Sequence, residues 1–206
     1  MCKETKQYKK YWQMILLGLA AGIITRLSDL CPYDDLWSFS SIATLFGFWI
    51  VTNSLIIWFA SSNRNAGIMV FLYMFFMDIS FYGLEYILGF FFQRFDNGGF
   101  RTGLFLIYGV GAIICGIMAY VLYFWNRKGW YSSVFLAGTV GVLLAETVGV
   151  TRYLLTQNTF LFQLLFDAVG VICLGVLFGR KAQNKVVFTG CVAVFTVVFY
   201  LFLYRY

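Results

Sequence analysis

The chain has 206 residues, of which 61% are hydrophobic, 21% aromatic and only 12% charged, and it contains a single proline. These proportions exclude an ordinary soluble domain and predict one transmembrane helical domain over residues 1–206, with the lipid bilayer as its solvent. The formal net charge is +6, but the basic residues lie in short connections between apolar runs, so no surface is left for a nucleic acid.

The apolar runs predict an all-α fold: a polytopic membrane helical bundle with seven transmembrane helices. The first run, 12–27, follows a basic segment, and a signal peptide cleaved after Ala20 is the alternative interpretation. Gly18 and Gly22 instead favour a retained helix in close contact with a neighbour. The other six runs are residues 42–60, 66–92, 103–125, 133–155, 160–179 and 186–204.

The charges between these runs predict the orientation of the bundle. With a cytoplasmic N-terminus, all seven lysines and three of the arginines lie inside, ten basic residues in total, while five arginines lie near the outer side. Basic residues favour the cytoplasmic side of a membrane protein. We therefore expect the N-terminus to be cytoplasmic and the C-terminus to be outside.

The run at 71–92 is apolar and aromatic but carries two carboxylates, Asp78 and Glu85. Seven residues turn a helix through 700°, so both acids share one face about 10 Å apart, with Tyr82 between them. Acidic residues inside a membrane segment are costly and usually face a bundle interior or a wet cavity. These three residues are therefore candidates for ligand binding.

Other polar residues fall at similar depths in the predicted helices. If the orientation holds, every charge within the membrane lies between its midplane and its outer surface, and this predicts a polar, aromatic-lined pocket open to the outside. The first, third, fifth and sixth helices would build it. The remaining candidate ligand-binding residues are Arg26, Glu146, Arg152, Tyr153, Gln163 and Asp167.

Four acids against two arginines leave an excess of negative charge, so some acids must be protonated or a cation must complete the set. The first hypothesis is therefore the binding or transport of a small cationic or polar solute, or a proton or sodium relay. The alternative is structural: the acids pair internally and fix the helix register, while Arg26 and Arg152 pair or extend toward the interface.

The small-residue faces suggest a second function class. Gly138, Gly141, Ala145 and Gly149 form a stripe on the fifth helix. Such stripes allow close helix packing, and we expect packing within the bundle. An accessory or structural subunit, with these faces docking a membrane protein partner, is the alternative function.

Catalysis is the least favoured hypothesis. Histidine is absent and the five cysteines show no metal-binding spacing, so the sequence predicts no metal site and no cofactor. An intramembrane hydrolase would need Asp78 beside Glu146 or Asp167 as an acid–base pair, and no supporting motif accompanies these residues.

Two passages carry a resemblance to known proteins: LWSFSSIATLFGFWIVTNSLI at 36–56, and NRKGW at 126–130 followed by AETVGV at 145–150. They resemble a group of small multi-pass membrane proteins of Gram-positive bacteria without an assigned function. The resemblance implies a bacterial plasma membrane and no particular activity. The architecture is also similar to the substrate-binding membrane subunits of energy-coupling-factor vitamin transporters. By this analogy Gly18 and Gly22 would meet a partner, although those subunits usually have six spans.

Overall fold

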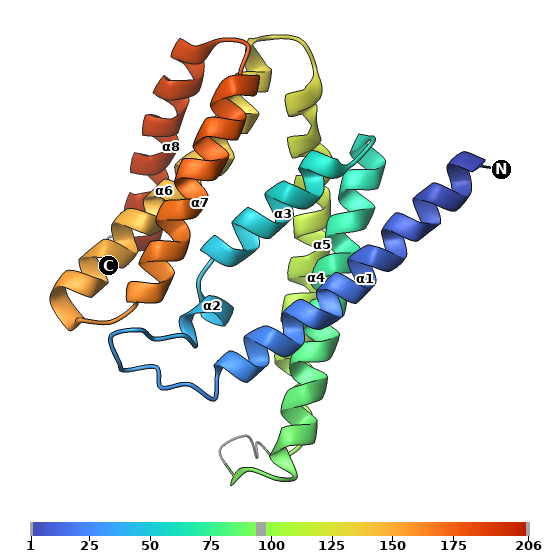
Figure 1. The fold of residues 1–206 in the computed structure, drawn as a ribbon, viewed down its shortest axis with the longest axis vertical. Coiled ribbons are helices and arrows are strands. Elements are labelled where there is room, and N and C mark those ends of the chain that lie inside the picture. The colour runs from blue at the N-terminus through green and yellow to red at the C-terminus, as the bar shows by residue number, and fades with distance from the viewer. Residues whose placement is uncertain (1, 94–97, 205–206) are drawn as a thin grey trace. The chain divides into compact units, whose positions relative to one another are not determined.

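The computed structural model describes the backbone of residues 2–93 and 98–204, and the side chains of these residues apart from 2–6 and 43. All regular elements in this part of the chain are helical (Figure 1). They are α1 (Cys2–Ser28), α2 (Ser41–Thr44), α3 (Gly47–Phe59), α4 (Asn63–Gly89), α5 (Thr102–Leu122), the 3-10 helix η2 (Tyr123–Asn126), α6 (Trp130–Gln157), α7 (Leu161–Lys181) and α8 (Lys185–Tyr204).

Six of these helices, α1, α4, α5, α6, α7 and α8, are long and apolar enough to cross a membrane. The prediction of an all-α, multi-pass membrane protein is therefore confirmed. The helices group into two compact units. Unit 1 comprises Met1–Ser28 and Ile56–Tyr123, and unit 2 comprises Asp29–Leu55 and Phe124–Tyr206.

The prediction of one continuous helix over 42–60 is wrong. The helical turn α2 ends at Thr44, Leu45 adopts an extended conformation (φ −96°, ψ 156°), and α3 begins at Gly47 with 13 residues. Local chemistry favours the interruption, because the Thr44 hydroxyl donates to the Ser41 carbonyl (3.1 Å) and glycine has a low helix propensity. A new helix, α3, therefore begins inside this apolar segment.

In unit 1, α1 and α4 run parallel to each other. Near their N-terminal ends, the Tyr11 hydroxyl donates to Asn65 Oδ1 (2.9 Å), and near their C-terminal ends Arg26 pairs with Glu85. Because the residue numbers rise together along both helices, the chain must return from the end of α1 at Ser28 to the level of Tyr11 before α4 begins. The end of α3 marks this return, since Lys10 Nζ donates to the Phe59 carbonyl (3.2 Å).

Glycines allow α1 to lie against α4. A Cβ atom on Gly18 would lie 2.3 Å from the carbonyl oxygen of Tyr73, and one on Gly22 would lie 2.2 Å from that of Met77. Only glycine permits such an approach of two backbones. The expected close helix contact is confirmed, and it is made within unit 1, so the proposed role of these glycines in meeting a partner is wrong for this face.

Unit 2 is built around α6, which packs against both α7 and α8. Its glycines contact α8: a Cβ on Gly141 would lie 2.6 Å from Phe195 Cβ, and one on Gly149 would lie 2.5 Å from the ring of Tyr204. The small-residue stripe of this helix is therefore used for packing inside the bundle, as expected.

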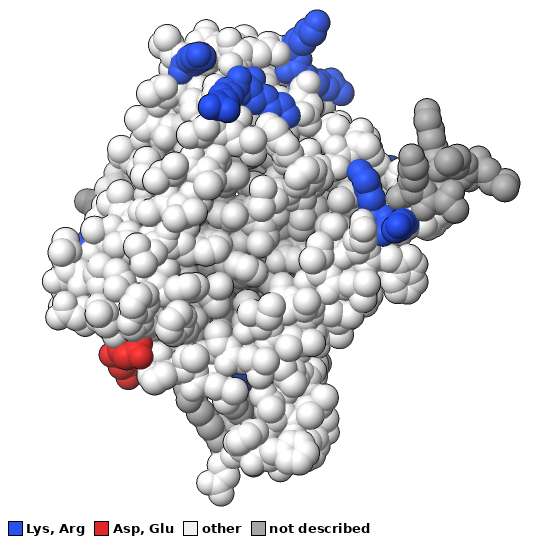
Figure 2. Space-filling view, in the orientation of Figure 1, with Lys and Arg blue, Asp and Glu red and all other residues white. Residues whose placement is uncertain are grey.

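The charges of unit 2 are unevenly distributed along its helices. On the face shown in Figure 2, lysines and arginines gather at the end where α7 turns into α8, and the sides of the helices carry almost no charge. The sequence places Arg127 and Lys128 before α6, and Arg180, Lys181 and Lys185 around the α7–α8 turn. An uncharged side between charged ends is the expected surface of a bundle in lipid.

Candidate functional site

The structure divides the predicted site residues between the two units. A single pocket formed by all of them stays a prediction. Each group is best understood within its own unit. Arg26, Asp78, Tyr82 and Glu85 lie in unit 1, and Glu146, Arg152, Tyr153, Gln163 and Asp167 lie in unit 2.

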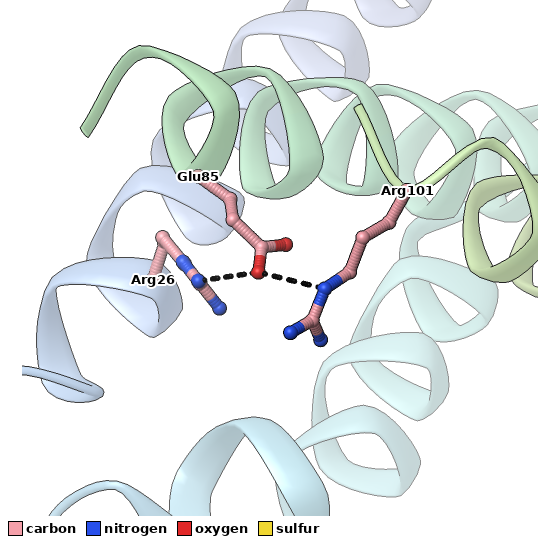
Figure 3. A network of polar contacts seen from close by, with 3 residues as sticks. All are labelled: Arg26, Glu85 and Arg101. Atoms are coloured by element: carbon pink, nitrogen blue, oxygen red, sulfur yellow. Dashed lines mark ion pairs between the residues drawn. The ribbon is translucent and has the colours of Figure 1, made fainter. Parts of the chain in front are cut away.

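In unit 1, Glu85 is an ion-pair centre. Arg26 Nη2 lies 2.8 Å from Glu85 Oε1, and Arg101 Nε lies 3.4 Å from the same oxygen (Figure 3). Glu85 and Arg26 are buried, and the Arg26 guanidinium also lies over the Phe81 ring at 4.9 Å. This arrangement supports the structural interpretation for Arg26 and Glu85. Sequence reasoning missed Arg101, because it lies in a connection rather than in a helix.

Asp78 and Tyr82 lie beside this network on α4, and both are buried. Tyr82 packs edge-on against Phe81 and Phe105. Asp78 forms no ion pair with any residue that the structure describes, and its Oδ2 atom has no hydrogen-bond partner. Glu85 therefore has arginine partners in unit 1, whereas the negative charge of Asp78 has no described partner there.

Unit 2 contains a second group of buried polar side chains, which we call the oxygen cluster: Glu146, Gln163 and Asp167. Glu146 projects from α6, while Gln163 and Asp167 lie one turn apart on α7. Their exposed fractions are 1%, 0% and 0%. Gln163 Nε2 donates to Asp167 Oδ1 at 2.8 Å, which fixes the two α7 side chains relative to each other.

Four acceptor oxygens of the oxygen cluster accept no hydrogen bond of normal geometry. Both Glu146 oxygens, Asp167 Oδ2 and Gln163 Oε1 are buried without a hydrogen-bond partner. Leaving a buried acceptor unsatisfied costs about 1–3 kcal/mol, and more when it is charged. Four such atoms in one cluster are the strongest indication of a ligand in the described part of the chain.

The interrupted helix begins against this cluster. Gly47, the first residue of α3, packs so tightly on Asp167 that a Cβ atom would lie 1.9 Å from Asp167 Oδ1. The backbone amides of Phe46 and Gly47 lie close to the Glu146 carboxylate, although neither Glu146 oxygen accepts a hydrogen bond of normal geometry. The N-terminus of a helix carries roughly half a positive elementary charge, so α3 partly compensates the carboxylates.

This compensation is incomplete. Glu146 and Asp167 lie close enough to repel each other, and neither pairs with a lysine or arginine among the described residues. Two ionised carboxylates against about half a positive charge leave more than one negative charge in an apolar interior, which is too costly to persist. Protonation of one carboxylate, or a cation beside them, would remove this excess charge. In the described part of the chain, no group of three or more His, Cys, Asp or Glu side chains is placed to hold a metal ion.

Arg152 and Tyr153 do not join the oxygen cluster. Arg152 is exposed, and its Nη1 donates to the Tyr204 carbonyl at 3.4 Å. Tyr153 is 40% exposed and packs edge-on against Phe160 and Tyr204. Both line a separate pocket of about 200 Å³ that also includes Gly149. Arg152 therefore does not supply the positive charge that Glu146 requires.

The connection of residues 29–40 covers the start of α7. The backbone amide of Phe160 donates to Ser38 Oγ at 3.3 Å, and the Phe160 ring packs edge-on against Tyr33 at 5.3 Å. Burial, together with the nearby Tyr153 and Asp34, raises the pKa of Tyr33 above its ordinary value. This connection holds the first turn of α7, and therefore Gln163, in place.

Comparisons with known proteins add no relationship: no family model, curated protein or solved structure matches the chain. The function must therefore be argued from the oxygen cluster itself.

Proposed function

We propose that this protein binds a small monovalent cation, Na⁺ or a proton, at Glu146, Gln163 and Asp167, as a solute-binding or transport protein of a bacterial plasma membrane. The observation that carries the proposal is the set of four buried acceptor oxygens without a donor. Carboxylate and amide oxygens suit a hard cation, and a proton satisfies the same atoms by converting a carboxylate into a donor.

The interrupted helix supports a transport role. In many membrane transporters, ions and substrates bind where a transmembrane helix is discontinuous, because the free backbone groups there contribute to the site. Here the break at Leu45 places the start of α3 against Asp167. Backbone that is not helical is tolerated at membrane depth where it lines a buried site rather than lipid.

The proposed topology has seven passes, with residues 41–59 as the interrupted one. The parallel arrangement of α1 and α4 supports it, because the chain between them must recross the membrane. The basic α7–α8 end of unit 2 would be cytoplasmic. Asp167 lies six residues from the start of α7 and fourteen from its end, about 9 Å and 21 Å along the axis, so the cluster would lie nearer the outer surface.

The accessory-subunit hypothesis gains no comparable support. The glycine faces of α1 and α6 are covered by α4 and α8. A partner would have to use other surfaces. Intramembrane hydrolysis, which would need Asp78 beside Glu146 or Asp167, gains none either, because Asp78 belongs to unit 1 and the other two acids belong to unit 2.

The test measures the stability and protonation of the purified protein in detergent. We compare wild type with Glu146→Gln and with the control Asp34→Asn, which changes an exposed carboxylate outside the helices. Each protein is unfolded thermally in NaCl, KCl and choline chloride at equal ionic strength. A cation that binds only the folded state at 100 times its Kd adds about 2.7 kcal/mol. If Na⁺ is the ligand, it raises the Tm of wild type and Asp34→Asn, but not of Glu146→Gln.

If a proton is the ligand, no salt is selective, and infrared spectra of wild type show a protonated carboxyl band that Glu146→Gln weakens. The proposal is wrong if no cation is selective and the spectra of wild type and Glu146→Gln show the same carboxyl bands.

A further inference from the structure

Unit 1 has an apolar groove on the surface of α4 and α5. These helices approach each other closely at two glycines: a Cβ on Gly67 would lie 3.0 Å from the Gly116 carbonyl oxygen, and one on Gly116 would lie 3.1 Å from that of Gly67. The missing side chains leave a groove of about 540 Å³, lined mainly by apolar groups that include Ile113 and Ile117. We call it the α4–α5 groove.

The groove is open to the surroundings of the bundle. Ile113 and Ile117 are 51% and 59% exposed, on a helix that is one of the least buried of the candidate membrane spans. Along α4 the groove extends from Arg64 to Phe71, which is about 10 Å or two helical turns. Since α4 and α5 are candidate membrane spans, the surroundings of this groove are lipid chains.

One end of the groove is positively charged. Arg64 lines it, is exposed, and belongs to the first turn of α4, at the end of the membrane span. Lys10 lies at the same end of unit 1, where its amine donates to the Phe59 carbonyl. Ser62 caps the N-terminus of α4 by accepting from the Asn65 amide, and the positive end of the helix dipole there favours a phosphate.

We propose that the α4–α5 groove binds an anionic phospholipid. One acyl chain lies along the groove over Gly67 and Gly116, and the phosphate lies at Arg64 and the first turn of α4. Apolar lining over two turns matches an extended hydrocarbon chain, and the charge at the membrane-interface end matches the headgroup. Neither feature is shared with the oxygen cluster, which lies in unit 2.

The test is native mass spectrometry of the purified protein with phosphatidylglycerol or phosphatidylcholine. Arg64→Gln removes the charge, and Ile113→Trp fills the groove. The control for Arg64→Gln is Lys128→Gln, which changes an exposed lysine in unit 2. The control for Ile113→Trp is Ile114→Trp, because Ile114 is the next residue, is 55% exposed, and does not line the groove.

We expect wild type to retain phosphatidylglycerol in preference to phosphatidylcholine. Arg64→Gln reduces this binding about fivefold, as expected for one basic residue near a membrane surface, and Ile113→Trp reduces it by filling the groove, while both controls retain it. Excess inorganic phosphate does not displace the lipid, because the acyl chain contributes to binding. The proposal is overturned if either test variant binds like wild type, if a control loses binding equally, or if phosphate alone competes.

Discussion

Replacing Gly47 with alanine probes the contact between the interrupted helix and the oxygen cluster. In most helices Gly→Ala stabilises by up to about 1 kcal/mol, because alanine has the higher helix propensity. At Gly47 the new Cβ would lie 1.9 Å from Asp167 Oδ1 and 2.8 Å from both Asp167 Cγ and Gln163 Nε2. These side chains are fully buried, so they have little room to move away.

We therefore expect Gly47→Ala to destabilise the protein by about 1–3 kcal/mol, the usual cost of overpacking a well-packed interior. Gly175→Ala is the matched control. It lies in α7 of the same unit, and its Cβ would meet no atom within 4 Å, so this variant keeps or gains stability. The assay is denaturant unfolding in mixed lipid–detergent micelles, followed by tryptophan fluorescence.

A double-mutant cycle locates the cause of the loss. Asp167→Ala removes the carboxylate that the new methyl group would meet, so adding Gly47→Ala to that background costs less than it does in wild type. Residues in contact typically show coupling energies of about 0.5–3 kcal/mol. Additive effects, or a Gly47→Ala variant as stable as Gly175→Ala, would refute the packing of α3 against the cluster.

Three further variants test unit 1 by the same unfolding assay. Glu85→Gln removes the carboxylate that pairs with two arginines, and we expect a loss of about 3 kcal/mol; a loss below 1 kcal/mol would contradict a structural role for this network. Gly22→Ala places a Cβ atom within 2.2 Å of a backbone carbonyl oxygen, so we expect this variant to be less stable than wild type. Its control is Gly109→Ala, whose Cβ would meet no atom within 4 Å and which should keep the stability of wild type. Equal effects of the two substitutions would contradict the close contact of α1 with α4. Asp78→Asn removes no described ion pair and changes stability by less than about 1 kcal/mol, so a larger loss would reveal an internal partner for Asp78.

The sequence predicted the long helices well because apolar composition and length determine them almost alone. Glycine spacing also identified real contacts, since Gly22 and Gly141 each allow a neighbouring helix to approach closely. Glu146 and Asp167 were identified as costly charges in apolar runs, and their burial agrees with that reasoning.

Two features were beyond sequence reasoning. The break at Leu45 lies within an apolar run that was predicted as one helix. The sequence around Gly47 also does not indicate that this glycine packs against Asp167, a carboxylate 120 positions later. Arg101 pairs with Glu85 through a connection whose path the sequence does not determine. The arginines were expected either to pair with acids or to extend toward the interface: Arg26 pairs with Glu85, and the exposed Arg152 contacts a backbone carbonyl.

The parallel arrangement of α1 and α4 has a consequence for biogenesis. Arg26 is synthesised 59 residues before its partner Glu85, which at about 5–20 residues per second corresponds to roughly 3–12 s. During that interval α1 is already long enough to enter the membrane, but it lacks this carboxylate, and until residues 73–77 are made it also lacks its glycine contacts. Insertion of α1 and assembly of unit 1 are therefore separate events on the ribosome. A nascent chain stalled before residue 85 has exited would hold α1 in an unassembled state that chaperones and membrane proteases can recognise.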